Sequence, residues 1–127
     1  MASALAGLRV LIFEDEALIA MMAEDMLADL GCVVVDVVGS VRRGLAIATD
    51  TARPLDGAVL DVNLGGEQVY PVAEALAARG VPFIFATGYD ASSISRSFAH
   101  VPVLPKPYQA QALEQRLISA LGARPAP

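Results

Sequence analysis

The chain has few of the residues from which covalent and soft-metal frameworks are built. Its 127 residues include one cysteine, one histidine and no tryptophan. A single cysteine cannot form an intrachain disulfide, and it cannot build a metal site by itself. Such sparing use of cysteine is typical of a reducing compartment, so we expect a cytoplasmic protein.

Positive charge is scarce as well. Lys and Arg together number 9 against 14 Asp and Glu, which gives a net charge of −5. Because nucleic-acid binding needs Lys and Arg clustered on one face, we exclude nucleic acid as a partner. No apolar run approaches the roughly 18 residues of a membrane span, and residues 1–7 lack the basic region of a signal peptide. We therefore expect no contact with a membrane.

Hydrophobic residues are abundant, at 55% of the chain, which excludes a disordered protein. A chain of this length forms one domain and buries about two-thirds of its unfolded surface. We predict that this domain covers residues 7–121 and that residues 122–127, which carry two prolines, form a loose tail.

Short β-rich runs and helical patterns alternate along the chain. The predicted strands lie at 8–13, 33–38, 58–60, 83–86 and 101–104, and the predicted helices lie at 17–30, 41–50, 67–79, 92–98 and 109–121. This order predicts an α/β fold of five β-α pairs, with a parallel sheet that has helices on both faces. The strands are continuous apolar runs, as burial on both faces requires.

Two helices carry a recognisable local signal. In the helix at 17–30, apolar side chains recur at intervals of three and four, which predicts a stripe that packs in the core. This stripe consists of Leu18, Met21, Met22, Met26 and Leu30. Ser40 precedes the helix at 41–50 and is the predicted N-cap.

The predicted strands end in residues that can carry chemistry. The first strand runs into Glu14-Asp15-Glu16, the third into Asp61, the fourth into Thr87 and the fifth into Lys106. Ligands of an open parallel sheet bind beyond the carboxyl ends of its strands. We therefore expect the acids, the hydroxyl and the ammonium to converge at one edge of the sheet.

These side-chain types fit phosphoryl chemistry. Clustered carboxylates repel one another unless a cation lies between them, and Mg²⁺ prefers a few oxygen ligands together with water. A carboxylate in such a cluster can attack a phosphoryl group, whose negative charge Mg²⁺, a lysine and a hydroxyl stabilise. Lys106 is the only lysine of the chain, and its bond to Pro107 is a candidate cis peptide.

The ordered set Glu14-Asp15, Asp61, Thr87 and Lys106-Pro107 resembles the response-regulator receiver domain of two-component signalling. This resemblance covers about residues 7–121. It implies a flavodoxin-like, doubly wound fold with five parallel strands in the order 2-1-3-4-5. The implied function is a single-domain response regulator, a signalling switch that catalyses only its own phosphorylation and slow dephosphorylation.

The resemblance also implies a role for each site residue. Asp61 would accept the phosphoryl group from a phosphohistidine. Asp15, Glu14 and Asp61, with the backbone carbonyl of Asn63, would hold Mg²⁺. Thr87 would hydrogen-bond the acyl phosphate, and Lys106 would pair with it.

The implied partners are a histidine kinase or phosphotransfer protein and a downstream protein. The downstream protein would bind the face made by the segment 92–98, the strand 101–104 and the helix 109–121.

The segment Phe85-Ala86-Thr87-Gly88-Tyr89 is similar to a stand-alone subclass of receivers named for a Phe-Ala-Thr-Gly-hydrophobic-Tyr signature, although here Tyr89 directly follows Gly88. One position departs from the family. Typical receivers carry an aromatic residue three positions before the lysine, and here that position is Val103. Val103 has no ring to rotate, so we expect Tyr89 to report phosphorylation instead.

Three other functions are consistent with parts of this pattern. A flavodoxin-like module for a nucleotide or flavin would need a phosphate-binding loop where the chain has Glu14-Asp15-Glu16. A phosphatase with an Asp nucleophile would carry a second acid where the chain has Asn63. A degenerate receiver that binds partners without phosphate is the third alternative, and Val103 keeps it open.

Overall fold

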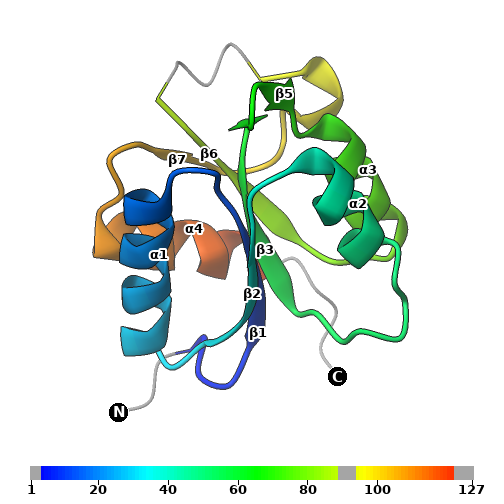
Figure 1. Cartoon of the computed structure of the whole chain (residues 1–127). Coiled ribbons are helices and arrows are strands. Elements are labelled where there is room, and N and C mark those ends of the chain that lie inside the picture. Colours follow the sequence, from blue (N-terminus) through cyan, green and yellow to red (C-terminus); the bar gives the residue numbers. More distant parts are fainter. Residues whose placement is uncertain (1–3, 89–93, 122–127) are drawn as a thin grey trace.

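The computed structural model describes residues 4–88 and 94–121 and shows one five-stranded parallel sheet with helices on both faces (Figure 1). The predicted strand order 2-1-3-4-5 is confirmed, because the sheet runs β2-β1-β3-β6-β7. These strands are β1 (Arg9–Phe13), β2 (Val33–Val38), β3 (Gly57–Asp61), β6 (Phe83–Thr87) and β7 (Val103–Pro105). The helices are α1 (Ala17–Asp29), α2 (Val41–Ala48), α3 (Tyr70–Ala78) and α4 (Ala110–Leu121).

The sheet separates two hydrophobic cores. Successive side chains of a strand point to opposite faces, so each central strand supplies both cores. In β1, Leu11 and Phe13 join the core beneath α2 and α3, whereas Val10 and Ile12 join the core beneath α1 and α4. Figure 1 shows these two helix pairs on opposite sides of the sheet. The continuous apolar runs in the sequence follow from this burial on both faces.

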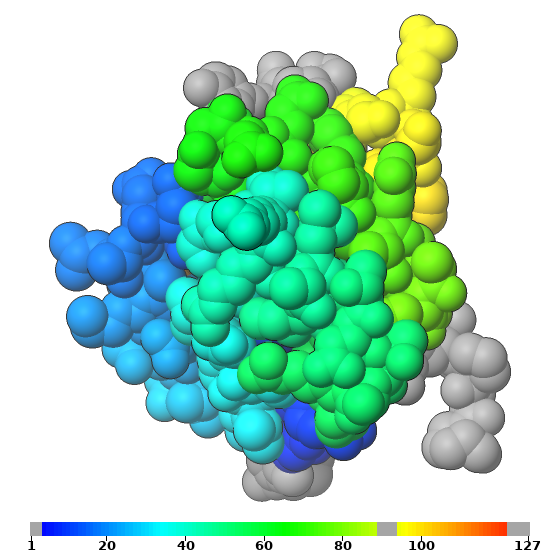
Figure 2. Space-filling view, turned by 45° about the vertical axis from the view of Figure 1, so that its right-hand side comes forward, coloured from blue at the N-terminus to red at the C-terminus, as the bar shows by residue number. Residues whose placement is uncertain are grey.

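The apolar stripe predicted for α1 is wrong on its main point. The buried residues of this helix are Ala20, Ala23 and Leu27. The predicted core residues Leu18, Met21 and Met22 are instead 74%, 55% and 43% exposed. Apolar residues occur around most of the helix, so periodicity alone could not select the face. The side of the helix with the small alanines packs against the sheet. Its other side forms part of the surface, where Figure 2 shows α1 in blue along the left margin of the molecule.

The third helix begins three residues later than predicted because a small hairpin takes its first residues. Asn63–Leu64 (β4) pairs with Glu67–Gln68 (β5) in antiparallel register around two glycines. Gly65 and Gly66 have φ of 60° and 84°, the left-handed region that glycine adopts readily. α3 then starts at Tyr70, with Pro71 in its first turn, where proline is tolerated.

The remaining boundaries differ from the predictions by a few residues. Ser40 caps α2 as expected, because the backbone N–H of Arg43 donates to the Ser40 hydroxyl at 3.2 Å. In the described part of the segment 92–98, Arg96–Phe98 form one 3₁₀ turn, η2, and not an α-helix. No helix among the described residues is long and apolar enough to cross a membrane. The predicted tail at 122–127 lies outside the described residues.

Candidate phosphoacceptor and metal site

The parallel register brings the predicted residues to one edge of the sheet. Phe13, which precedes Glu14, pairs with Leu60, which precedes Asp61. Thr87 ends β6 and pairs with Pro105 of β7, directly before Lys106. The backbone N–H of Lys106 also donates to the Thr87 carbonyl at 3.0 Å. The strand ends therefore lie side by side, as the topology of an open sheet requires.

Three carboxylates gather at this edge. Carboxylate oxygens of Glu14, Asp15 and Asp61 all lie within 4.8 Å of one another. Glu14 and Asp61 are only 2% and 6% exposed, whereas Asp15 is exposed. Holding three acids this close favours a hard divalent cation with oxygen ligands, and the exposed Asp15 leaves room for water on such an ion. The residues present therefore fit Mg²⁺.

The Lys106 ammonium bridges the two buried acids. Its Nζ lies 2.7 Å from Glu14 Oε1 and 2.9 Å from Asp61 Oδ2. Burial by itself would lower the pKa of Lys106, but the hydrogen bonds and charges of Glu14 and Asp61 together raise it. The lysine is therefore a fixed positive charge at this edge.

Asp61 is harder to ionise than an ordinary aspartate. Its pKa is raised to about 6, because burial penalises the charge and Glu14 repels it, while Lys106 offsets part of both effects. The backbone N–H of Asn63 donates to Asp61 Oδ1 at 3.2 Å and orients the carboxylate. Asp61 is thus held in place and carries a proton more readily than usual when no metal is bound.

Asp61 also faces an open hollow of about 430 Å³. The hollow is lined by Asp15, Glu16, Asp61, Asn63, Gly66, Thr87, Gly88 and Lys106. A phosphoryl donor could enter it and meet an acid, a hydroxyl and an ammonium. Of the six described residues predicted to hold metal or to act on the phosphoryl group, Glu14 is the one that does not line this hollow.

Of the two residues that the predicted switch concerns, the structure describes Val103. Val103 is half-buried and pairs with Phe85 of β6, so no ring occupies that position. Tyr89, the expected reporter, lies outside the described residues.

One residue of the site was missed. The Tyr108 hydroxyl donates to Glu14 Oε1 at 3.4 Å, and the tyrosine is 5% exposed. Its position two residues after Lys106 was the available signal, but an aromatic residue before a helix is normally taken as core. The Lys106-Pro107 bond between these two residues is cis, as the sequence suggested.

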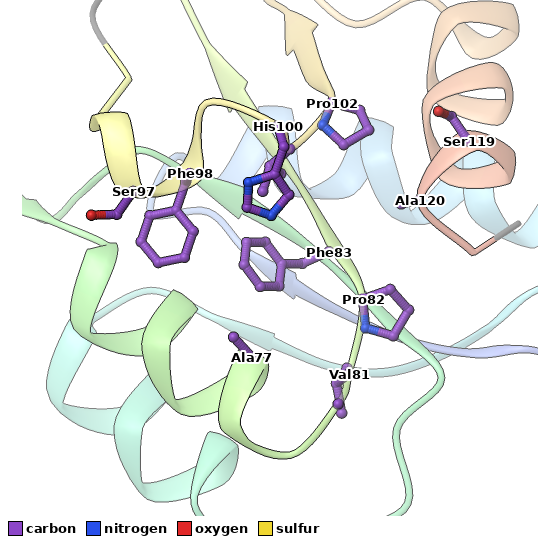
Figure 3. A pocket seen from close by; sticks show the side chains of 12 residues that line it. Ala77, Val81, Pro82, Phe83, Ser97, Phe98, His100, Pro102, Ser119 and Ala120 are labelled. Atoms are coloured by element: carbon purple, nitrogen blue, oxygen red, sulfur yellow. The ribbon is translucent and has the colours of Figure 1, made fainter. Parts of the chain in front are cut away.

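A second hollow, of about 550 Å³, lies where β6 and β7 begin (Figure 3). Its lining comes from the end of α3, the start of β6, η2 with the loop after it, and the end of α4. Figure 3 shows the rings of Phe83, Phe98 and His100 grouped together in its lining. The described residues of this lining include no acid. This hollow is therefore chemically unlike the one above Asp61.

The structure is similar to solved receiver domains. SdrG from Sphingomonas melonis Fr1 is 44% identical, with a TM-score of 0.79 over 94% of this chain and 99% of SdrG. The receiver domain of a modulated diguanylate cyclase from Desulfovibrio desulfuricans G20 is 31% identical, with a TM-score of 0.77 over 91% of this chain and 94% of that chain.

The receiver domain of the Erythrobacter litoralis response regulator PhyR is 25% identical, with a TM-score of 0.81 and 98% of each chain covered. No family model matches the sequence, and no curated protein is significantly similar to it.

Proposed function

The chain belongs to the receiver-domain family of response regulators in two-component signalling, and we propose that it is a phosphorylation-controlled switch whose acceptor is Asp61. Lys106 lies 2.9 Å from Asp61 in a hollow that also holds Thr87, and three carboxylates lie within 4.8 Å of one another. This arrangement is the main support for Asp61 as the phosphoacceptor. It combines a nucleophile, a metal site and two groups that stabilise a phosphoryl anion.

The proposed step is a direct transfer. An Asp61 oxygen attacks the phosphorus of a phosphohistidine, and a P–O bond forms as the P–N bond breaks. The imidazole keeps the electron pair and takes a proton from solvent. Mg²⁺, held by Glu14, Asp15, Asp61 and the Asn63 carbonyl, would neutralise charge on the phosphoryl oxygens.

Lys106 and Thr87 act on the product. Once Asp61 carries the phosphoryl group, the ammonium pairs with a phosphoryl oxygen and the hydroxyl donates to another. These contacts favour the phosphorylated form over the free form and give the switch its second state. In this proposal the chain catalyses only its own phosphorylation and slow dephosphorylation. We also propose that it acts in the cytoplasm.

Two surfaces are proposed for partners. The exposed apolar side of α1, made by Leu18, Met21 and Met22, adjoins Asp15 and Glu16 and suits the protein that carries the phosphohistidine. The face made by η2, β7 and α4 suits the downstream partner, because the second hollow gives it an apolar depression (Figure 3).

Intact mass spectrometry tests the acceptor. Incubation with acetyl phosphate and Mg²⁺ should add one phosphoryl group to the wild type and to the exposed control Asp25→Asn, but not to Asp61→Asn. Removal of Mg²⁺ with EDTA should abolish the gain. Labelling that persists in Asp61→Asn would move the acceptor elsewhere. If the wild type showed no gain at all, the degenerate-receiver alternative that Val103 keeps open would take its place.

A further inference from the structure

Lys106 and Tyr108 donate to the same oxygen of Glu14. The Lys106 ammonium lies 2.7 Å from Oε1, and the Tyr108 hydroxyl lies 3.4 Å from that atom. The other carboxylate oxygen, Oε2, accepts the backbone N–H of Glu16 at 3.1 Å. At 3.4 Å the tyrosine bond is long and weak, because the lysine holds the nearer place.

The proposed function requires Lys106 to give up part of this contact. To pair with a phosphoryl group on Asp61, the ammonium must turn from Glu14 toward the acceptor. The side chain of Glu14 is 0% exposed, so solvent cannot replace the lysine as a donor. Even with Mg²⁺ held by Glu14, the oxygen Oε1 that faces Lys106 and Tyr108 would still need a hydrogen-bond donor. A buried carboxylate that loses a donor is strongly destabilised. A second donor that stays with Oε1 would therefore ease the departure of the lysine.

Tyr108 is well placed to compensate. Its ring packs in the core beneath α1 and α4, beside Leu113 and Leu117, so its hydroxyl has few other positions available. A small approach of this hydroxyl toward Oε1 would turn the long contact into a normal hydrogen bond as the ammonium withdraws. The phenol remains neutral, because burial and then the charge of Glu14 raise its pKa well above the usual range.

We propose that Tyr108 is a positioning residue that holds Glu14 when Lys106 turns to the phosphorylated acceptor. The tyrosine touches neither the phosphoryl group nor Asp61, and it acts through Glu14. This inference rests on the proposed function and adds a fourth side chain to the charge network of Glu14, Asp61 and Lys106. A phenylalanine at position 108 would fill the same core space but could not donate a hydrogen bond to Glu14.

The single lysine of the chain allows a direct test. Protein labelled with ¹³C and ¹⁵N only in lysine gives the signals of one side chain, that of Lys106, and its Cε signal lies next to the ammonium. The probe is beryllium trifluoride with Mg²⁺. The conformation of SdrG that beryllium trifluoride activates has been solved. Titration of this signal gives the affinity of the acceptor site without following catalysis.

The variants are Tyr108→Phe and the matched control Tyr70→Phe. Tyr70 also uses its hydroxyl, which accepts the backbone N–H of Ser95 at 3.0 Å, but it lies on the other face of the sheet. We expect Tyr108→Phe to weaken beryllofluoride binding about fivefold to tenfold, which is within the range for the net contribution of one typical hydrogen bond. The unliganded Lys106 signal should also shift, because the lysine becomes the remaining side-chain donor to Oε1. Tyr70→Phe should match the wild type in both readouts.

The outcomes separate the two proposals. Unchanged or tighter binding in Tyr108→Phe, with an unmoved lysine signal, overturns the role of Tyr108 and leaves the proposed function in place. A wild-type lysine signal that does not respond to beryllofluoride and Mg²⁺ overturns the proposed function and this inference together. Thermal unfolding of the wild type, Tyr108→Phe and Tyr70→Phe checks that each protein is folded. We expect Tyr108→Phe to fold because phenylalanine keeps the aromatic ring.

Discussion

At the scale of single residues, one ammonium serves two buried carboxylates. Glu14 and Asp61 share the Lys106 side chain, which is 14% exposed, and the charge of Glu14 contributes to the raised pKa of Asp61. In the metal-free protein, ionised Asp61 therefore opposes folding. An acid at this position is accounted for by the proposed function, in which the same carboxylate binds a cation and attacks phosphorus.

The pKa of Asp61 predicts how stability depends on pH in the absence of metal. Its folded pKa of about 6 lies above the ordinary value of 3.8, so the folded chain holds the proton more tightly than the unfolded chain does. That stabilisation is complete below about pH 4 and is lost as the pH rises through 6. The Asp61→Asn variant has no carboxylate to ionise at this position. Its free energy of unfolding relative to that of the wild type should therefore rise by about 1–3 kcal/mol between pH 4 and pH 8.

Urea unfolding in EDTA at pH 4, 5, 6 and 8 measures this difference. The control is Asp25→Asn, which removes a carboxylate at an exposed position on α1. A constant gap between Asp61→Asn and wild type across this range would contradict the raised pKa.

The sequence identified most of this site because topology decides where strand ends meet. Glu14, Asp15, Asp61, Thr87 and Lys106 each follow or end a strand, and parallel strands bring those positions together. Tyr108 lies beyond the end of β7, and its hydroxyl reaches Glu14 only because the ring is buried beneath α1 and α4. Such a contact depends on three-dimensional packing, which no local pattern encodes.

At the scale of elements, α1 shows the limit of periodicity. A helix with apolar residues around most of its circumference gives several acceptable stripes, and the large residues Leu18, Met21 and Met22 indicated the wrong one. The packed face carries Ala20 and Ala23, whose small side chains let the helix lie close to the sheet. α3 shows a different limit, because pairing of Glu67–Gln68 with Asn63–Leu64 delays its start.

The exposed side of α1 predicts a selective defect in phosphotransfer. Replacing Leu18, Met21 and Met22 by serine should leave stability within about 1 kcal/mol of wild type, because these side chains are largely in solvent. Phosphorylation by acetyl phosphate should also be unchanged, since the hollow is intact. Transfer from a phosphohistidine protein should slow at least about tenfold, because truncating several apolar anchors of an interface costs more than about 1.4 kcal/mol.

The test measures the rate of phosphorylation by acetyl phosphate and by a phosphohistidine protein. The control is a variant of another exposed apolar residue. Val33→Ser serves, because Val33 is 52% exposed and lies at the start of β2. Rates equal to those of the wild type with both donors in the triple variant would show that this side of α1 does not contact the phosphohistidine protein.

At the scale of the whole molecule, β6 connects the two hollows. Phe83, at one end of this five-residue strand, lines the apolar hollow, and Thr87, at the other end, lines the hollow above Asp61. The ring of Phe83 also makes edge contacts with Phe85 and Phe98, at centroid separations of 5.6 and 5.9 Å. A shift at Thr87 therefore has a short, tightly packed route to the far hollow.

His100, the only histidine of the chain, reports on that hollow. Beryllofluoride with Mg²⁺ should shift the ¹³C and ¹H signals of its ring in the wild type, because the packed strand transmits a change at Thr87. The shift should be absent in Asp61→Asn. A His100 signal that does not move while the Lys106 signal responds would uncouple the proposed partner face from phosphorylation.

The architecture was predictable from the sequence because its rules are strong. Five apolar strands alternating with helices permit few arrangements of a parallel sheet, and the resemblance to receivers supplied the strand order. The apolar hollow was not predictable. Its walls come from the ends of elements far apart in the chain, and only their meeting makes Phe83, Phe98 and His100 neighbours.

The placement of the chain's one lysine has a chemical consequence for the living cell. Acetylation or carbamylation of a side-chain amine, or attachment of another protein through one, can occur only at Lys106. Each such reaction would erase the positive charge that Glu14 and Asp61 now surround. Under the proposed function, acylation of a side-chain amine in this chain would therefore disable the switch.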